Sequence, residues 1–262
     1  MLAVLSIAGS DSSGGAGIQA DIKTIAAHLL FAETAVTALT AQNTTGVFGV
    51  EEASPEFVAA QIDAVFDDIR PAAVKVGMVS SAAIIEAIAQ RLAYWEAENI
   101  VVDPVMVATS QARLIDDGAV DALKERLIPL ADIVTPNLFE AEALSGASLG
   151  TDGEKEEAAR LLAHMARGAA LVKGGHSAGA ADDLLATKDG GVLWVRGPRI
   201  DTENTHGTGC TLSSAIACNL ALGLDMPSAV RKAKDYVSGA LRSSLALGRG
   251  SGPLNHMWEY QD

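Results

Sequence analysis

The sequence has few basic side chains. Lysine and arginine number 19 against 33 aspartates and glutamates, so the formal net charge is −14. Surfaces that bind nucleic acids or anionic membranes need clustered lysine and arginine, and no such cluster is visible here. We therefore expect neither kind of partner. An anionic ligand must instead be attracted by local features such as a helix N-terminus, a single lysine or a metal ion.

Cysteine and long apolar runs are also scarce. The only cysteines are Cys210 and Cys218. If both lie on one helix they are about 12 Å apart along its axis, which is too far for a disulfide. The start of the chain has no basic leader, and no apolar run reaches the roughly 18 residues of a membrane span. These features predict a protein of the reducing cytoplasm.

The composition that is present favours one large core. The chain has 262 residues, 49% of them hydrophobic, and 25 glycines. Short β-branched runs alternate with longer Ala/Leu segments, which is the pattern of parallel strands covered by helices on both faces. No compositional break marks a linker, so we expect a single α/β domain over residues 1–262.

The alternation predicts where strands and helices lie. Strands are expected at 2–8, 34–40, 73–76, 100–102, 133–134 and 170–172, with an edge pair at 183–186 and 193–195. Helices are expected at 17–30, 55–69, 81–98, 117–127, 137–144, 154–167, 209–222 and 228–247. In open α/β sheets ligands bind beyond the carboxyl ends of strands, where we place Asp21, Gln42, Met78, Asp103 and Asn137.

One glycine-rich turn before a helix predicts an anion site. It contains Gly207, Thr208, Gly209 and Cys210. Glycines there let backbone N–H groups converge on one point, and the helix dipole adds positive charge suited to a phosphoryl group. The alternative is an ordinary turn. The chain has neither a Walker A sequence nor a GxGxxG run that opens a helix after a strand.

Two further polar residues stand out beside buried strands. Asp21, one helical turn into the first helix, can accept a hydrogen bond from a substrate hydroxyl or amine; alternatively it only complements the helix dipole. Lys173 follows a buried strand and is a candidate to neutralise the phosphates of ATP, although a surface lysine is the ordinary alternative.

Seven segments together resemble one known family. The hydroxymethylpyrimidine phosphate kinases carry, in this order, AGSDSSGGAGIQADIKT, TAQNTTGV, VGM, VDPVM, TPNLFEA, VKGGH and NTHGTGCTLS. The resemblance covers essentially the full length, and seven ordered segments are far more specific than any single motif.

The resemblance implies a ribokinase-like three-layer α/β/α sandwich with a mostly parallel sheet. It also implies that ATP and magnesium phosphorylate 4-amino-5-hydroxymethyl-2-methylpyrimidine and then its monophosphate. The substrate pocket implied in this chain is formed by Gly9, Asp21, Gln42, Met78 and Val105. An aminopyrimidine needs donors, acceptors and a polarizable wall, which these residue types supply.

The resemblance also assigns the cofactor residues. Asp103 and Glu140 are similar to the acidic residues that organise magnesium, directly or through water, and the ATP site takes in Lys173, Asn137, Thr205 and His206. Without the resemblance, Asn137 reads as a helix cap and Glu140 as part of a solvated face.

Cys210 departs from the wider ribokinase pattern, in which sugar kinases carry an aspartate as general base. A helix N-terminus lowers the pKa of a thiol, so Cys210 is a catalytic candidate; a packing role is the alternative. His206 is a candidate to contact phosphate or support Cys210, or is a buried structural histidine.

Three other functions stay open at this stage. Cys210 and His206 could form a hydrolytic pair, but no third orienting group is evident. A pyrimidine-binding sensor without chemistry would not need the glycine loop. Pyridoxal kinase is the nearer alternative, since its substrate is a similar flat alcohol, and close analogues are separated by only a few kcal/mol. The resemblance further suggests a homodimer.

Overall fold

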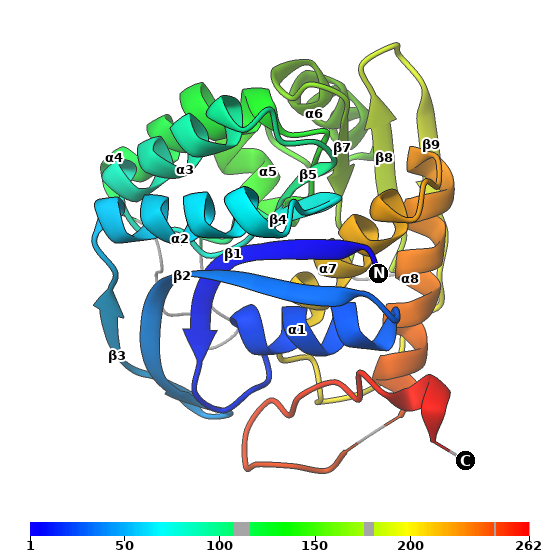
Figure 1. Ribbon diagram of the computed structural model, residues 1–262. Coiled ribbons are helices and arrows are strands. Elements are labelled where there is room, and N and C mark those ends of the chain that lie inside the picture. The colour runs from blue at the N-terminus through cyan, green and yellow to red at the C-terminus, as the bar shows by residue number, and fades with distance from the viewer. Residues whose placement is uncertain (107–115, 176–180, 244, 262) are drawn as a thin grey trace.

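The computed structural model describes residues 1–106, 116–175, 181–243 and 245–261. Within these residues one mixed sheet contains nine strands in the order β3-β2-β1-β4-β5-β6-β7-β8-β9 (Figure 1). The strands are β1 (Ala3–Asp11), β2 (Phe31–Asn43), β3 (Gly46–Glu52), β4 (Ala73–Val76), β5 (Ile100–Val102), β6 (Ile133–Val134), β7 (Ala169–Val172), β8 (Asp183–Thr187) and β9 (Val192–Val195).

The sheet is parallel in the middle and antiparallel at both edges. Strands β2, β1, β4, β5, β6 and β7 pair in parallel, so their carboxyl ends meet at one side of the sheet. Strand β3 returns antiparallel to β2, and β8 and β9 form the expected antiparallel pair beyond β7. The predicted, mostly parallel α/β sheet is confirmed.

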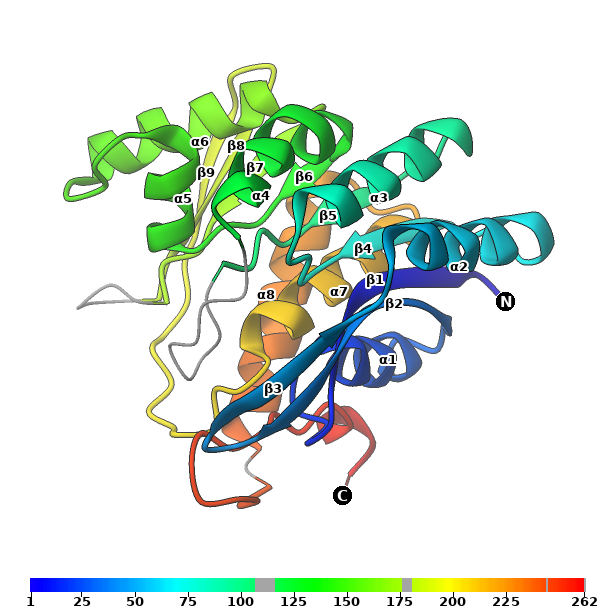
Figure 2. The same ribbon diagram turned by 90° about the vertical axis from the view of Figure 1, so that its left-hand side faces the viewer.

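Helices cover both faces of the sheet (Figure 2). One apolar core lies under α2 (Pro55–Asp68), α3 (Ala82–Tyr94), α4 (Asp117–Ala122), α5 (Leu138–Ser145) and α6 (Asp152–Met165). The other lies under α1 (Gly17–Ala27), α7 (Thr208–Ala221) and α8 (Met226–Arg242). Successive strand residues face opposite sides, so Val4 joins the second core and Leu5 the first.

Local sequence signals set several helix starts. The Ser54 hydroxyl accepts the N–H of Phe57, and proline follows at the first helical position of α2. A capping box joins Thr151 to Glu154 at the start of α6. These signals explain why the predicted starts lie within two residues of the observed ones. No helix in the described ranges is long and apolar enough to cross a membrane.

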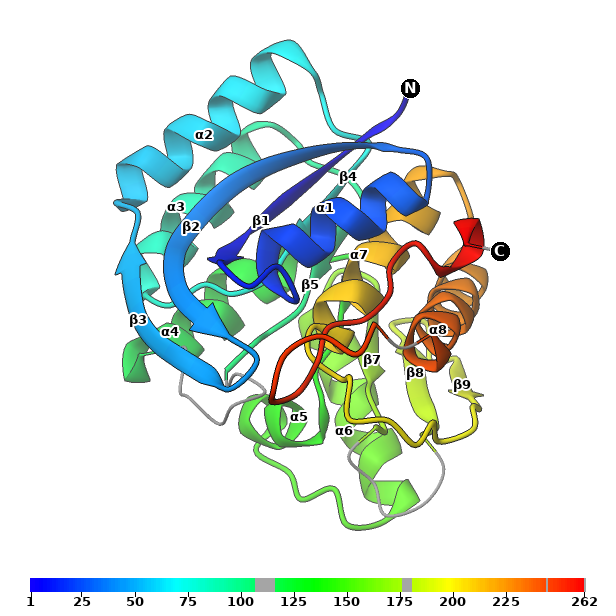
Figure 3. The ribbon, with the colours of Figure 1, turned by 90° about the horizontal axis from the view of Figure 1, so that it is seen from below.

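Two predictions about elements were wrong. The chain after Asn43 forms strand β3, which was not predicted because most of its side chains are exposed and it lacks a buried alternating face. Helix α8 ends at Arg242 rather than 247, and Ala246 and Gly248 have left-handed backbones that a helix cannot contain. The chain instead turns back, and the red C-terminal segment crosses beneath α7 (Figure 3).

Candidate active site

The glycine-rich turn lies at the N-terminus of α7. Gly207 has φ +86°, and a Cβ atom there would lie 1.9 Å from the carbonyl oxygen of Gly15. Only glycine fits, because both the left-handed backbone and the close approach exclude a side chain. The turn is thus packed directly against the loop that follows β1.

Two amides of this turn are available to a ligand. The N–H of Thr208 donates to Thr205 O at 3.2 Å, and the N–H of Thr211 donates to Gly207 O at 2.9 Å. Between them, the N–H groups of Gly209 and Cys210 have no protein acceptor among the described residues. Helix α7 has 14 residues, so its dipole adds to these donors.

A lysine and two carboxylates face the same turn. Lys173 Nζ lies 2.8 Å from Asp103 Oδ1 and 3.9 Å from Glu140 Oε2. A Cβ atom on Gly209 would lie 3.3 Å from Asp103 Oδ2 and 3.4 Å from Lys173 Nζ. Asp103 follows β5, Glu140 lies on α5, Lys173 follows β7 and Gly209 lies in α7, and the fold brings these four residues together.

Glu140 is buried, which contradicts the alternative of a solvated helix face. Its carboxylate completes a capping box with Asn137, so the expected helix-capping role of Asn137 is present. Burial raises the pKa of Glu140, Lys173 lowers it and Asp103 raises it further. A second cation beside these two buried carboxylates would compensate the negative charge that Lys173 alone leaves unbalanced.

This donor set fits magnesium. The ion takes one or two protein carboxylates, keeps waters and uses substrate phosphates for its remaining ligands. Asp103 and Glu140 provide two such carboxylates on either side of Lys173, and Asp103 also lies against Gly209 of α7. In the described part of the chain no cluster of three His, Cys, Asp or Glu side chains is placed to hold a metal, so an all-protein cage is not what these residues form.

Of the residues expected to line a ring pocket, Gly9, Gln42, Met78 and Val105 lie at or just beyond the ends of β1, β2, β4 and β5, and Asp21 lies in α1. A Cβ atom on Gly9 would lie 3.0 Å from Met78 Sδ, so the absence of a side chain makes room for the thioether. Thr37 fixes the Met78 carbonyl with a 2.8 Å bond. Val105 follows β5, and its N–H bonds to Asp103 O at 2.8 Å.

Asp21 occupies a different environment from the one expected. Its carboxylate is fully buried, lies 2.8 Å from Lys75 Nζ, and accepts the hydroxyls of Ser6 and Ser214 at 2.5 and 2.8 Å. Lys75 is equally buried. A ligand contact with Asp21 therefore requires exchange of one of these bonds.

The expected low pKa of Cys210 is wrong in this structure. Burial raises the pKa of the thiol to about 11; Lys75 lowers it, while Asp21 and Asp103 raise it. The N–H of Gly17, at the start of α1, also bonds to Cys210 and favours the thiolate, but the net direction is upward. Desolvation outweighs the helix dipole, and Cys210 is a neutral thiol at pH 7.

His206 is buried and faces Asp11 rather than Cys210. Its Nε2 lies 2.7 Å from Asp11 Oδ2 and 3.4 Å from Gln42 Nε2. An ionised Asp11 only accepts, so we assign the proton of His206 to Nε2. Gln42 Nε2 also carries only hydrogens, so that longer contact is not a hydrogen bond, while Gln42 Oε1 accepts the hydroxyl of Thr40 at 3.2 Å.

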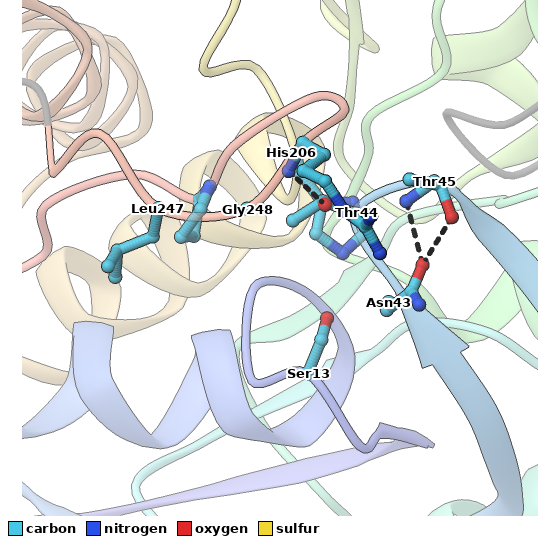
Figure 4. Close-up of a pocket in the computed structure, with 9 residues that line it drawn as sticks. Ser13, Asn43, Thr44, Thr45, His206, Leu247 and Gly248 are labelled. Atoms are coloured by element: carbon cyan, nitrogen blue, oxygen red, sulfur yellow. Dashed lines mark hydrogen bonds between the residues drawn. The ribbon is translucent and has the colours of Figure 1, made fainter.

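An open cavity of about 350 Å³ lies beside His206. Ser13 of the loop after β1, Asn43 to Thr45 of the β2–β3 turn, and Leu247 with Gly248 surround it (Figure 4). Thr44 Oγ1 accepts the N–H groups of Arg249 and Gly250 at 3.2 Å each. The C-terminal segment is thereby attached to the turn that follows Gln42.

Sequence reasoning missed two buried charged residues. Lys75 lies in the strand Ala-Val-Lys-Val, and a lysine in so apolar a run needs a buried anion, which was a usable signal. Asp11 stands in the first quoted segment, but an aspartate followed by serines at a strand end reads as an ordinary turn. Only the fold shows that Asp11 contacts His206.

Comparison with known proteins identifies the family. The family model described as phosphomethylpyrimidine kinase matches residues 11–255. A hydroxymethylpyrimidine/phosphomethylpyrimidine kinase of Haemophilus influenzae is 44% identical over 261 residues, covering 98% of this chain and 97% of the relative. A bifunctional thiamine biosynthesis protein of Geobacter sulfurreducens is 50% identical over 262 residues, and the chain spans 53% of that longer protein.

Solved structures agree with the fold. A phosphomethylpyrimidine kinase of Clostridium difficile is 42% identical with a TM-score of 0.81, covering 91% of this chain and 98% of that one. An ADP complex of Bacillus subtilis pyridoxal kinase is 35% identical with a TM-score of 0.90, covering 99% of each chain. The ribokinase-like sandwich and the phosphotransferase class are confirmed.

These identities also separate the two kinase readings. The named pyrimidine kinases are 42–44% identical to this chain, against 35% for the Bacillus pyridoxal kinase. The predicted pyrimidine kinase is therefore favoured over the pyridoxal kinase and over a sensor without chemistry. By the family model and by full-length relatives, the chain belongs to the phosphomethylpyrimidine kinase family.

Proposed function

We propose that this protein transfers the γ-phosphoryl group of ATP to 4-amino-5-hydroxymethyl-2-methylpyrimidine and then to its monophosphate, two steps in the formation of thiamin. The observation that carries the proposal is the position of the α7 turn. Gly209, which carries one of its free amides, lies against Lys173 and Asp103, and Gly207 lies against the loop after β1.

The ATP side of the site is assigned to the cluster around Lys173. Its ammonium group, together with the amides of Gly209 and Cys210, faces negative charge in a protein that is otherwise strongly acidic. Asn137 starts α5 beside it and pairs with Lys173 as an isolated bridge. Thr205 belongs to the same turn, and its carbonyl accepts the hydroxyl of Thr208 at 2.8 Å.

Magnesium is assigned to Asp103 and Glu140. When bound there, it neutralises charge on the ATP phosphates and orients the transferred group. The protein itself holds Asp103 in place through the Thr135 hydroxyl at 3.2 Å and through Lys173. Because Glu140 is fixed by the capping box, both carboxylates are ordered before a ligand arrives.

The ring side is assigned to Gly9, Gln42, Met78 and the backbone of Val105. Met78 supplies an apolar wall, and the carboxamide of Gln42 supplies donors and an acceptor for a pyrimidine edge. Asp21 belongs to this side as well, behind the Ser214 hydroxyl and Lys75. The acceptor oxygen then lies near Cys210.

The reaction forms a bond between the acceptor oxygen and the γ-phosphorus and breaks the bond to the β-phosphate oxygen, releasing ADP and a proton. Phosphoryl transfer depends mainly on positioning and electrostatics. As a neutral thiol, Cys210 contacts the reacting group as a hydrogen-bonding partner at the helix N-terminus, and its amide contributes to the anion hole.

The test is an ADP-release assay with purified protein, MgATP and one acceptor at a time. Turnover with hydroxymethylpyrimidine and with its monophosphate, confirmed by mass spectrometry of the products, is the expected result. Turnover confined to pyridoxal or pyridoxine would identify the pyridoxal kinase instead. Binding of the pyrimidine without ADP release would identify a sensor, and unchanged rates after chelation would remove magnesium from the proposal.

The proposal also covers the oligomeric state and the location of the protein. We place one kinase domain over residues 1–262 in the cytoplasm, acting as a homodimer. Light scattering after size-exclusion chromatography tests the dimer, because a single chain of 26.9 kDa and a pair are well separated by this method.

A further inference from the structure

We propose that Asp11 is a positioning residue, which fixes the phosphoryl-transfer turn relative to the ring pocket by holding His206. The inference rests on the proposed function and adds a residue that the substrate and cofactor sets do not include. Asp11 is the last residue of β1, 195 positions before His206 in the chain, and the two side chains meet at 2.7 Å.

Asp11 joins two loops through one carboxylate. Its Oδ1 accepts the N–H and the hydroxyl of Ser13, each at 2.8 Å. Its Oδ2 accepts the N–H groups of Gly15 and Ala16 at 3.0 and 2.8 Å, as well as His206 Nε2. Five donors therefore converge on a side chain that is 2% exposed.

These donors keep Asp11 ionised. Burial by itself raises the pKa of Asp11, but the bonds from His206, Ser13 and Ala16 outweigh burial and hold the pKa well below its usual range. A carboxylate is the only side-chain group of this size that accepts from all sides. In an asparagine one of the two oxygens is replaced by an N–H₂ group, which cannot accept, so the hydrogen bonds to that position would be lost.

His206 transmits this restraint to the transfer turn. Its ring occupies the space left by Gly15, where a Cβ atom would lie 2.3 Å from the His206 ring. The backbone N–H of His206 donates to Gly252 O at 3.1 Å, so His206 is held by Asp11 through its ring and by Gly252 through its backbone. The next residue, Gly207, begins the turn whose amides face the phosphoryl group.

The C-terminal segment holds the transfer turn from the side opposite to β1, so the His206 contact controls the distance between the turn and β1. Thr205 contacts Ser251 at 3.1 Å, and Thr211 bonds to His256 at 3.0 Å, so the C-terminal segment supports the turn from behind. The Asp11–His206 hydrogen bond ties the start of the turn directly to β1, the strand that carries Gly9, whereas the Cys210 thiol reaches only the N–H of Gly17 at the start of α1. A displacement of about 1 Å between acceptor and phosphoryl donor can lower turnover about 10²-fold.

The experiment compares five variants of the full chain, four single and one double. Asp11→Asn and His206→Leu remove the contact, whereas His206→Gln keeps an N–H donor at the same reach. Asp132→Asn is the matched control. Asp132 also accepts a backbone N–H, from Ile100, and pairs with the cation of Arg167, but it lies just before β6, at the amino ends of the strands and away from the site. For each variant, kcat and KM are measured for hydroxymethylpyrimidine and its monophosphate, together with urea unfolding.

We expect Asp11→Asn and His206→Leu to lower kcat for both acceptors by about 10²-fold with little change in KM. His206→Gln should recover most of the loss, and Asp132→Asn should lower stability without lowering kcat. The Asp11→Asn/His206→Leu double variant should lose no more than either single variant, because both remove one link.

Equal kcat for Asp11→Asn and Asp132→Asn would overturn the inference, as would additive losses in the double variant. If Asp11→Asn does not fold, His206→Gln and His206→Leu decide the question, since equal kcat in these two would also overturn it. A wild-type protein without pyrimidine turnover would instead refute the proposed function, and the inference with it.

Discussion

The buried pair of Lys75 and Asp21 gives the sharpest prediction about stability. Both side chains are fully inaccessible, and Nζ lies 2.8 Å from Oδ2. Replacing Lys75 by methionine keeps the apolar stem but leaves Asp21 as a buried anion with only the hydroxyls of Ser6 and Ser214. We expect Lys75→Met to lose stability because that charge is no longer compensated.

The magnitude follows from what removal of one partner costs. An uncompensated buried charge costs about 3–5 kcal/mol. For a domain of this size each kcal/mol lowers Tm by about 2–4 °C, so the expected loss is about 6–20 °C. The Lys75→Met/Asp21→Asn double variant, which removes both charges, should recover part of it.

Lys75 itself should add no pH dependence to stability near neutrality. Burial alone lowers the pKa of Lys75, but Asp21 and other nearby acidic groups outweigh burial and hold the pKa above its usual value of 10.5. A cation with a raised folded-state pKa contributes stability fully below the unfolded value and loses it only as the pH rises through the folded value. Lys75 therefore contributes its full stabilisation from about pH 6 to pH 9, and any change with pH in the loss caused by Lys75→Met would report protonation of the unpaired Asp21.

Urea unfolding followed by circular dichroism is the assay. Lys155→Met is the control, since Lys155 pairs with a largely exposed Asp152 at 3.0 Å and should change stability by less than about 1 kcal/mol. If Lys75→Met cost no more than Lys155→Met, the reasoning about the buried pair would be refuted.

Three further predictions concern turnover and pH. Cys210→Ala should lower kcat about tenfold or more while leaving ATP affinity, measured by calorimetry, nearly unchanged; unchanged turnover would assign the thiol to packing. Gly207→Ala should abolish most ADP release, because its Cβ atom would lie 1.9 Å from Gly15 O; normal kcat would contradict this geometry. Burial, and then Asp68, raise the pKa of Glu33 to about 7. The folded protein thus binds a proton that the unfolded chain has released, so stability should fall by about 1–2 kcal/mol as the pH rises from about 4.5 to 7. Glu33→Gln should flatten this dependence in urea titrations at pH 5 and 8, and an unchanged slope would count against it.

The sequence by itself determined the alternation of strands and helices. The bounds of the short buried strands Ala73–Val76 and Ile100–Val102 agree with the prediction to the residue. Short β-branched runs between two helical patterns are too short for a helix and therefore indicate a strand. Strand β3 was not predicted, since an exposed edge strand lacks the buried, alternating apolar residues on which the prediction depends. The predicted end of α8 was wrong because the chain beyond Arg242 takes left-handed backbones at Ala246 and Gly248, and Gly248 packs against Thr44, a contact with a residue far away in the sequence.

The motifs also predicted the family and which residues share the carboxyl edge of the sheet. Asp103 lies at that edge as expected, because parallel strands bring their ends together whatever the separation in sequence, and it meets Lys173 and Gly209 there. Local rules thus suffice for residues that follow strands and start helices.

Only the tertiary structure decided the electrostatic state of the site. A helix N-terminus alone predicts a reactive thiolate, but burial raises the pKa of Cys210 instead. The sequence predicts Asp21 as an acceptor for a substrate or a complement to the helix dipole, and the structure instead surrounds it with Lys75 and Ser214. Asp11 has the pattern of a turn residue, and only the fold brings it to His206. Burial and long-range partners fix the charge of a side chain, and neither is a property of its neighbours in sequence.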